Sequence, residues 1–235
     1  LGIVPFQNRL ARFVNNLLDA VIYAGILVYL IIRPYLVQPF YIPSESMVPT
    51  LKVGDVVMVG KFSYRLGQPQ RFDIVVFRAP DWALNSWQTP GKTDFVKRLV
   101  GLPGDVIEIK AGEGLYLNGK LLNEPYLNGV PQYSMKIIDG WVYVYSDFGD
   151  IWKGGENTMP QRVLDDTERQ KVLRTPSQPI PPGKYLMLGD NRNHSSDGRH
   201  WGLLDSNRVV GKALFVFWPP NRIGAANRGE LPKVE

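Results

Sequence analysis

The sequence predicts a mainly β protein preceded by a membrane-spanning helix. The chain has 235 residues, and its 19 prolines and 23 glycines make it rich in turns, which favours β structure over a helical bundle. Short runs rich in β-branched residues recur from Gln38 onward and are bounded by turn residues. One long apolar run, Ala20–Ile32, comes before them. We therefore expect an anchor followed by a β-rich body of one or two domains.

The anchor is predicted over residues 13–37, after a cytoplasmic segment at residues 1–12. The run Ala20–Ile32 carries no charge, but as a helix it would rise only about 20 Å, against about 30 Å of hydrocarbon. Extending the helix back to Phe13 supplies the missing length, so we favour an anchor over the alternative of a buried core helix. No small-residue cleavage site follows, which disfavours a removable signal peptide.

The charges around the apolar run indicate its orientation. Arg9 and Arg12 lie on its N-terminal side, so the positive-inside tendency places the N-terminus in the cytoplasm and the rest of the chain outside. Arg33, at the other end, weakens this preference. The net charge of +5 suits an anionic partner, and because no tight cluster of Lys and Arg occurs, we expect lipid rather than nucleic acid.

Two residue types limit the chemistry that is open to the chain. Cysteine is absent, which excludes disulfides and thiolate metal sites. The two histidines, His194 and His200, are too few for a histidine-rich metal site. We expect neither a metal nor a cofactor.

The β-like runs follow one another along most of the chain. They predict strands at residues 55–59, 73–77, 94–100, 106–109, 115–117, 141–145, 184–188 and 213–218. The pair Asn118-Gly119 predicts a tight hairpin, and the pattern at residues 163–173 predicts a short helix. Residues 123–182 are otherwise irregular and polar, and we expect them to belong to an insertion or second lobe.

The loop at residues 80–93 is marked by two tryptophans, Trp82 and Trp87. They form either a small cluster at a hairpin tip or an aromatic contact at the bilayer interface, where tryptophan is enriched. With an anchor nearby, the sequence leaves both interpretations open.

Two serines stand between two prolines soon after the apolar run, in Pro43-Ser44-Glu45-Ser46-Met47-Val48-Pro49. Each proline fixes its own φ and biases the residue before it towards extended backbone. The segment therefore predicts a stiff turn that would hold a serine hydroxyl in a defined place. Such turns are usually ordinary, so the rest of the chain must decide whether this one is catalytic.

A lysine lies inside one of the predicted strands. With a period of two, Lys97 shares a face with Phe95 and Leu99, and Arg98 lies on the other face. A lysine on such a strand either extends its amine to solvent or is buried. Burial would lower its pKa and leave a neutral amine, which is a competent general base.

The densest polar stretch of the chain is the loop at residues 189–202, GDNRNHSSDGRHWG, which follows a predicted strand. Its acid and amide side chains either cap their own backbone in a solvated turn or build part of a site.

Four blocks occur in one order along the chain. They are residues 43–51, 54–55, 97–105 and 189–199, with Arg71–Phe77 in addition. Together they closely resemble the bacterial type I signal peptidases. The resemblance covers residues 33–111 and 181–218, and the apolar run fits it as well.

The resemblance implies an endopeptidase with a Ser-Lys dyad that removes signal peptides from exported preproteins by cutting after small residues. Ser46 would be the nucleophile and Lys97 the general base. The oxyanion hole would use the Ser44 hydroxyl and the Ser46 backbone N–H, and Ser195 would orient the Lys97 amine. An ion-pair set would support the site through Asp190, Asp197, Arg98 and Arg199. Pockets for small substrate side chains would be lined by Phe40, Ile42 and Val96.

The resemblance also implies an architecture and a location. The fold would be a signal-peptidase-like coiled β-sheet catalytic domain with an inserted β-rich lobe. We expect a catalytic domain at residues 38–111 and 181–220, the lobe at residues 112–180 and a C-terminal tail at residues 221–235. A single-pass protein of the cytoplasmic membrane would carry this domain on the extracytoplasmic side, with preproteins and the bilayer as partners.

Three residues depart from the usual pattern of that family. Glu45 stands where a small residue is frequent, Asn193 where an aspartate is frequent, and Gly198 where a serine is frequent. None removes a proposed catalytic group. The changes at Asn193 and Gly198 affect the supporting polar network.

Three other functions stay open. In a Ser-His-Asp hydrolase, His194 or His200 would be the base for Ser46, and an aspartate of the polar loop would orient it. A self-cleaving repressor would share the Ser-Lys pair, but those proteins carry a DNA-binding region that the sequence does not indicate. In a non-enzymatic membrane-anchored β domain, neither Ser46 nor Lys97 would be needed.

Overall fold

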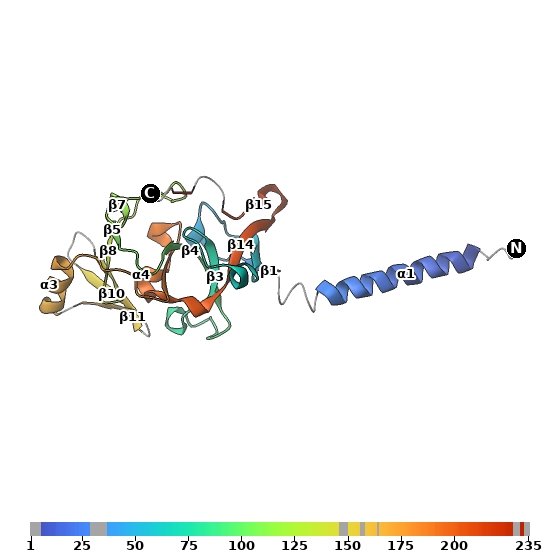
Figure 1. The fold of residues 1–235 in the computed structure, drawn as a ribbon, viewed down its shortest axis with the longest axis horizontal. Coiled ribbons are helices and arrows are strands. Elements are labelled where there is room, and N and C mark those ends of the chain that lie inside the picture. Colours follow the sequence, from blue (N-terminus) through green and yellow to red (C-terminus); the bar gives the residue numbers. More distant parts are fainter. Residues whose placement is uncertain are drawn as a thin grey trace.

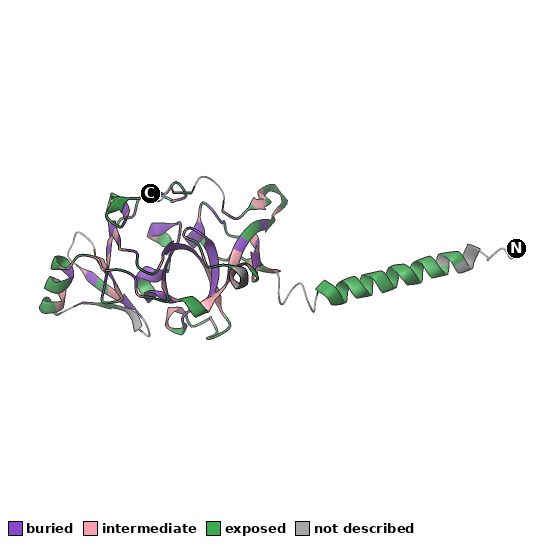
Figure 2. Ribbon diagram, in the orientation of Figure 1, coloured by how far each residue is buried: buried purple, intermediate pink, exposed green. Residues whose placement is uncertain are grey.

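The computed structural model describes residues 6–28, 37–145, 150–155, 158–163, 165–227 and 231–232. Helix α1 (Phe6–Leu27) extends away from a β-rich body (Figure 1). Every side chain from Ala11 to Val28 is exposed (Figure 2). The helix therefore contributes nothing to the hydrophobic core, and the alternative of a buried core helix is wrong.

The predicted anchor over residues 13–37 is not confirmed. Among the described residues, no helix is both long enough and apolar enough to cross a bilayer. Residues 29–36 of that prediction lie outside the described part of the chain.

The first sheet carries most of the predicted catalytic domain and confirms the mainly β prediction. Its strands are antiparallel and lie in the order β1 (Val37–Tyr41), β2 (Val56–Gly60), β14 (Val209–Trp218), β3 (Ile74–Arg78), β4 (Asp94–Gly101), β12 (Lys184–Leu188) and β13 (Leu204–Asp205), with β15 (Gly224–Ala225) beside β14. The sheet curls strongly (Figure 1). Buried aliphatic side chains such as Val57, Ile74 and Val216 pack together in one of its cores.

A second antiparallel sheet forms the lobe. Its strands lie in the order β11 (Thr158–Arg162), β10 (Ile151–Gly155), β9 (Trp141–Tyr145), β8 (Ser134–Ile138), β5 (Ile107–Lys110), β6 (Gly114–Leu117) and β7 (Lys120–Leu121). Helix α3 (Asp166–Arg174) packs Val172 against Ile138 and Ile151. Two boundaries differ from those expected. Strand β5 already pairs within this sheet, although the lobe was expected to begin at residue 112. Strand β15 pairs with β14 of the first sheet, although residues 221–235 were expected to form a tail.

Short helices connect the strands. They are α2 (Ser63–Leu66), α4 (Gly198–Trp201) and the 3-10 helices η2 (Glu45–Met47), η3 (Asp81–Ala83), η4 (Arg192–His194), η5 (Ser206–Arg208) and η6 (Pro220–Arg222).

Local sequence signals explain two of the connections. Asn118 and Gly119 have φ values of 51° and 83°, the left-handed pair that a two-residue hairpin requires between β6 and β7. The Asp165 side chain accepts a hydrogen bond from the Glu168 N–H and so caps the start of α3.

Candidate active site

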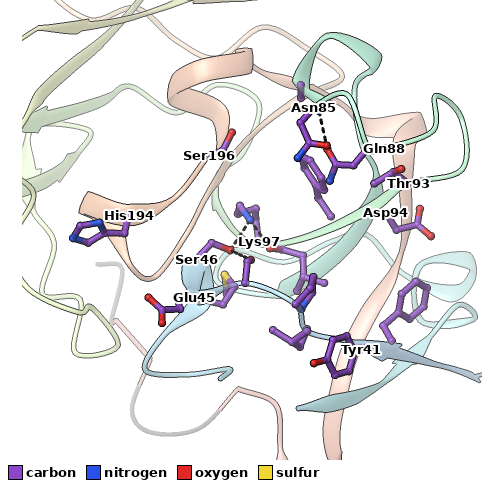
Figure 3. A pocket seen from close by; sticks show the side chains of 18 residues that line it. Tyr41, Glu45, Ser46, Asn85, Gln88, Thr93, Asp94, Lys97, His194 and Ser196 are labelled. Atoms are coloured by element: carbon purple, nitrogen blue, oxygen red, sulfur yellow. Dashed lines mark hydrogen bonds between the residues drawn. The ribbon is translucent and has the colours of Figure 1, made fainter. Parts of the chain in front are cut away.

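Ser46 and Lys97 come together although they belong to different elements. Ser46 lies on η2, Lys97 lies on β4, and the Lys97 Nζ donates a hydrogen bond of 2.9 Å to the Ser46 Oγ. The two side chains point toward each other in Figure 3. Both residues are buried, with exposed fractions of 8% and 5%. This is the nucleophile and base geometry that acyl transfer by a serine requires.

The turn that carries Ser46 is held by the polar loop. Met47 is almost fully buried and anchors η2 in the core. The Asn191 N–H donates to the Ser46 carbonyl at 3.1 Å, and the Asn191 side-chain amide donates to the Glu45 carbonyl at 3.2 Å. These contacts fix the backbone on both sides of the nucleophile.

The Lys97 amine lies in a poorly solvated environment. Its Nζ is 5.7 Å from the centre of the Phe95 ring, and its second hydrogen bond goes to the Val96 carbonyl at 3.0 Å. Burial lowers the pKa of Lys97 from 10.5 to about 8, although the nearby carboxylates of Asp197 and Asp190 oppose the shift. A large fraction of the amine is therefore neutral near pH 8.

This pKa predicts the pH dependence of the reaction. The neutral amine accepts the Ser46 proton, so the cleavage rate is expected to rise with pH and to reach half of its plateau near the pKa of Lys97, about 8. A histidine base would place this midpoint near its ordinary pKa of about 6.5. Measuring kcat/KM across the neutral and alkaline range, with one peptide substrate, distinguishes the two bases.

The Ser44 hydroxyl lies beside the nucleophile. Its Oγ is 3.2 Å from the Ser46 Oγ, and the residue itself is exposed. Ser44 has extended backbone, with φ −132° and ψ 161°, directly before η2 begins. The hydroxyl is thus placed where it can donate to an oxyanion that forms next to Ser46.

Ser195 lies close to the nucleophile turn, but in the described part of the chain it makes no hydrogen bond to Lys97. Its Oγ is buried and has no hydrogen-bond partner among the described residues. Gly189 separates it from the nucleophile turn. A Cβ on Gly189 would lie 2.2 Å from the Ser195 Oγ and 2.5 Å from the Ser46 carbonyl oxygen, so only glycine fits there. The expected Lys97–Ser195 hydrogen bond therefore stays a prediction.

The four predicted supporting residues form two separate buried ion pairs. The Arg98 guanidinium donates to both oxygens of Asp190, at 2.7 and 2.6 Å. Asp197 accepts from Arg199 at 2.7 Å and from the Gly189 N–H at 3.0 Å. Asp190 of the first pair also accepts a hydrogen bond from Thr50, and the second pair lies within the polar loop.

A pocket of about 450 Å³ opens over the dyad (Figure 3). The three residues predicted to contact substrate, Phe40, Ile42 and Val96, all line it. The Ser46 and Lys97 side chains lie in the same wall. Within the described residues, no group of three or more His, Cys, Asp and Glu side chains is arranged to hold a metal ion.

The two histidines are poorly placed to replace Lys97. His194 lines the pocket, but no hydrogen bond to Ser46 is found among the described residues, and His200 lines a different pocket with Trp152 and Arg199. The carboxylates that would orient a histidine already bind arginines. The geometry thus favours the Ser-Lys pair.

The two tryptophans of the loop at residues 80–93 differ in environment. The Trp82 indole packs with the core around Trp201 and donates to the Trp201 carbonyl at 3.1 Å. Trp87 is 90% exposed. Trp82 therefore belongs to the cluster interpretation, and Trp87 is the residue that is free to contact a bilayer.

Comparison with known families decides the relationship. The family model described as "Signal peptidase, peptidase S26" matches residues 14–218 of the chain. The chain belongs to this family.

Individual relatives agree with the family assignment. Signal peptidase IB of Staphylococcus aureus is 39% identical over 80% of this chain and 82% of the relative. Signal peptidase I of Bacillus caldolyticus is 35% identical over 84% of this chain and 88% of the relative. A probable signal peptidase I-2 of Synechocystis is 34% identical over 94% and 78%. A crystal structure of a signal peptidase I from Enterococcus faecalis covers 61% of this chain and 95% of its own, with 29% identity and a TM-score of 0.35.

The sequence analysis missed three residues of this S26 peptidase site. Gly189 and Asn191 position the nucleophile turn, and Thr50 donates to Asp190 at 2.5 Å. Gly189 and Asn191 lie inside the polar loop at residues 189–202, and Thr50 lies inside the first block at residues 43–51. Their roles depend on contacts with distant segments, so no local pattern could reveal them.

The departures from the family pattern have structural outcomes. The Asn193 side chain accepts from the Gln132 N–H at 2.9 Å and donates to the Val130 carbonyl at 3.0 Å. A Cβ on Gly198 would lie 2.9 Å from the Met187 carbonyl oxygen, so the glycine allows close packing against β12. Glu45 is exposed at the pocket rim.

Proposed function

We propose that the chain is a membrane-attached serine endopeptidase that removes N-terminal signal peptides from exported preproteins. The observation that carries the proposal is the hydrogen bond between the Lys97 Nζ and the Ser46 Oγ in the wall of a pocket, in a member of the S26 signal peptidase family. Relatives named signal peptidase I cover most of the chain.

The proposed reaction begins with proton transfer inside the dyad. Neutral Lys97 takes the proton of the Ser46 hydroxyl as the Oγ attacks the scissile carbonyl carbon. The Ser44 hydroxyl and the Ser46 backbone N–H stabilise the oxyanion that forms. The Lys97 ammonium then protonates the leaving amine, and the C–N bond breaks. Water, activated by the same amine, hydrolyses the acyl-enzyme and releases Ser46.

The substrate is proposed to bind as an extended segment between two strand edges. Strand β1 is an edge strand of its sheet, and the pocket wall includes its Phe40 and Tyr41. Residues Asp94–Lys97 of β4 pair with β3 on one side. On the other side of β4, the pairing with β12 begins only at Arg98. Both free edges offer backbone groups to a peptide. Phe40 and Val96 restrict the pocket, which favours small side chains at the first and third positions before the cut.

Membrane attachment is proposed to use α1 and exposed aromatic groups. Apolar side chains such as Phe13, Leu17 and Val21 on α1 are each more than half exposed. On the β body, Trp87 and Trp218 are 90% and 53% exposed. Apolar groups of this size are stabilised at a bilayer interface. The catalytic domain would lie on the extracytoplasmic side of the cytoplasmic membrane, where exported preproteins emerge.

Cleavage of a preprotein tests the function directly. The purified chain, in detergent, is expected to cut a secretory preprotein once, after an Ala-X-Ala sequence, and mass spectrometry of the new N-terminus identifies the bond. Ser46→Ala should lower kcat by at least about 10³-fold, because among the described residues the Ser46 Oγ is the hydroxyl that is hydrogen-bonded to the Lys97 base. His194→Ala and His200→Ala should each retain substantial activity.

Two outcomes would contradict the proposal in different ways. Equal cleavage by the parent and by Ser46→Ala would remove the enzymatic function, and the binding-domain alternative would then apply. Near-complete loss in both histidine variants would replace the Ser-Lys dyad with a histidine base.

A further inference from the structure

A segment of the lobe is hydrogen-bonded to the polar loop at residues 189–202, next to the active site. We define the strap as residues Glu124 to Tyr133, between β7 and β8. It belongs to the lobe by sequence, yet its hydrogen bonds reach the loop that follows β12. The Asn128 N–H donates to the Asp190 carbonyl at 3.1 Å. At the other end of the strap, the Asn193 side chain accepts from the Gln132 N–H and donates to the Val130 carbonyl.

The strap contacts each of the three arginines that are buried among the described residues, Arg98, Arg192 and Arg199. The Arg98 Cζ lies 3.8 Å from the centre of the Tyr126 ring. The Arg199 Cζ lies 4.3 Å from the centre of the Tyr133 ring. These arginines have exposed fractions of 0% and 6%. Aromatic faces attract guanidinium groups strongly when water is excluded.

The third arginine has a carboxylate partner. Glu124, 8% exposed, accepts from the Arg192 guanidinium through both of its oxygens, one of them at 2.9 Å. The Tyr126 hydroxyl donates to Glu124 at 2.7 Å and fixes the carboxylate. A bidentate pair of this kind constrains the orientation of the guanidinium plane.

Arg192 transmits this constraint to the nucleophile turn. Its Nε donates to the Gly189 carbonyl at 3.2 Å. Gly189 is packed so closely that a Cβ would lie 2.5 Å from the Ser46 carbonyl oxygen. The next residues continue the contact, because the Asn191 N–H bonds the same Ser46 oxygen. A short chain of contacts thus joins Glu124, Arg192, Gly189 and Ser46.

We infer that Glu124 is a positioning residue for the Ser46–Lys97 dyad and that the strap is the part of the lobe that holds the active site in shape. This inference rests on the proposed peptidase function and gives the lobe a role within it. Without the Glu124 carboxylate, Arg192 would lose its partner in a buried site and move, and the Gly189 carbonyl would follow. The dyad would then open to water.

The test compares Glu124→Gln with two matched controls in the full-length chain. Glu113→Gln removes another carboxylate of the lobe that also accepts from a tyrosine, Tyr116. Glu113 is exposed, and within the described ranges it forms no ion pair with an arginine. Val172→Ala weakens the lobe core at α3, away from the strap. The measurements are the thermal unfolding midpoint and the pH dependence of kcat and KM with one signal-peptide substrate, at a temperature well below unfolding.

Glu124→Gln is expected to lower kcat by about 10²-fold, as a displacement near 1 Å would. Water that reaches Lys97 should raise the pKa of its amine, so the midpoint of the variant's pH–rate profile should move from about 8 towards 10.5. KM should change little, since Glu124 does not line the pocket over the dyad and Phe40, Ile42 and Val96 keep their places. Glu124→Asp, which keeps the charge, should recover part of the rate. Val172→Ala should lower the thermal unfolding midpoint but leave the pH–rate profile equal to that of the parent. Glu113→Gln should have the unfolding midpoint and the pH–rate profile of the parent.

The outcomes separate the inference from the function on which it rests. If the parent does not cleave, the proposed function fails. If the parent cleaves and a folded Glu124→Gln keeps its kcat and pH midpoint, the inference alone is overturned. If Glu124→Gln does not fold, Asn193→Ala decides, because alanine can neither accept from the Gln132 N–H nor donate to the Val130 carbonyl. An alkaline shift of the pH–rate midpoint in Asn193→Ala supports the inference, and a midpoint equal to that of the parent refutes it.

Discussion

Lys97→Met is expected to abolish cleavage and, at pH 7, to make the protein more stable. The rate should fall by at least about 10³-fold, because no other base lies within reach of the Ser46 Oγ among the described residues. Stability should rise because burial holds the pKa of Lys97 at about 8, against 10.5 in the unfolded chain. The shift corresponds to at most about 3 kcal/mol of unfavourable free energy when the amine is charged.

The stability that Lys97→Met gains over the parent depends on pH. Below pH 8 both states of the parent bind the proton, and the cost of burying the ammonium is fully present. Between pH 8 and 10.5 the unfolded chain binds more protons than the folded one, so the parent gains stability as pH rises. The advantage of Lys97→Met should therefore shrink across this range, as measured by urea unfolding at several pH values.

Lys120→Met is the matched control for this prediction. Lys120 is exposed on β7, so its replacement should change the unfolding free energy by no more than about 0.5 kcal/mol and leave cleavage unchanged. A Lys97→Met protein that is less stable than the parent at pH 7 would show that the amine is not desolvated as the structure indicates.

Asp190→Ala is expected to destabilise the protein by about 3–5 kcal/mol, because it leaves the Arg98 guanidinium buried without its carboxylate. Both side chains are essentially inaccessible to solvent, at 0% and 1% exposure. Asp190 also accepts from Thr50, so the variant loosens the end of the nucleophile segment as well. Chemical unfolding measures the change in free energy.

The exposed ion pair of Arg162 and Asp150 supplies the control. Its side chains are 51% and 44% exposed, so Asp150→Ala should cost no more than about 1 kcal/mol. Adding Arg98→Met to Asp190→Ala should restore much of the lost stability, because neither charge of this pair then stays buried without its partner. Equal losses in Asp190→Ala and Asp150→Ala would mean that the buried pair does not support the fold.

The dyad was predictable because its two members lie in recognisable blocks. Ser46 stands between two prolines, and Lys97 stands in a strand with apolar neighbours on its face. The pocket residues Phe40 and Val96 followed from the same resemblance. The role of Trp82 was left open, since its packing on Trp201 joins segments far apart in the sequence. The strap could not be predicted, because the sequence of residues 124–133 has no regular pattern.

By itself, the sequence determined the local features: the stiff turn at Ser46, the alternating strands, the Asn118-Gly119 hairpin and the family to which these blocks belong. Their causes are local, because φ restrictions and side-chain alternation act over a few residues. Only the tertiary structure decided that Lys97 is desolvated and lies 2.9 Å from a hydroxyl 51 residues away. Only it placed Glu124 against Arg192. Desolvation and buried ion pairing depend on every segment that excludes water from a site, and these segments are brought together only by folding.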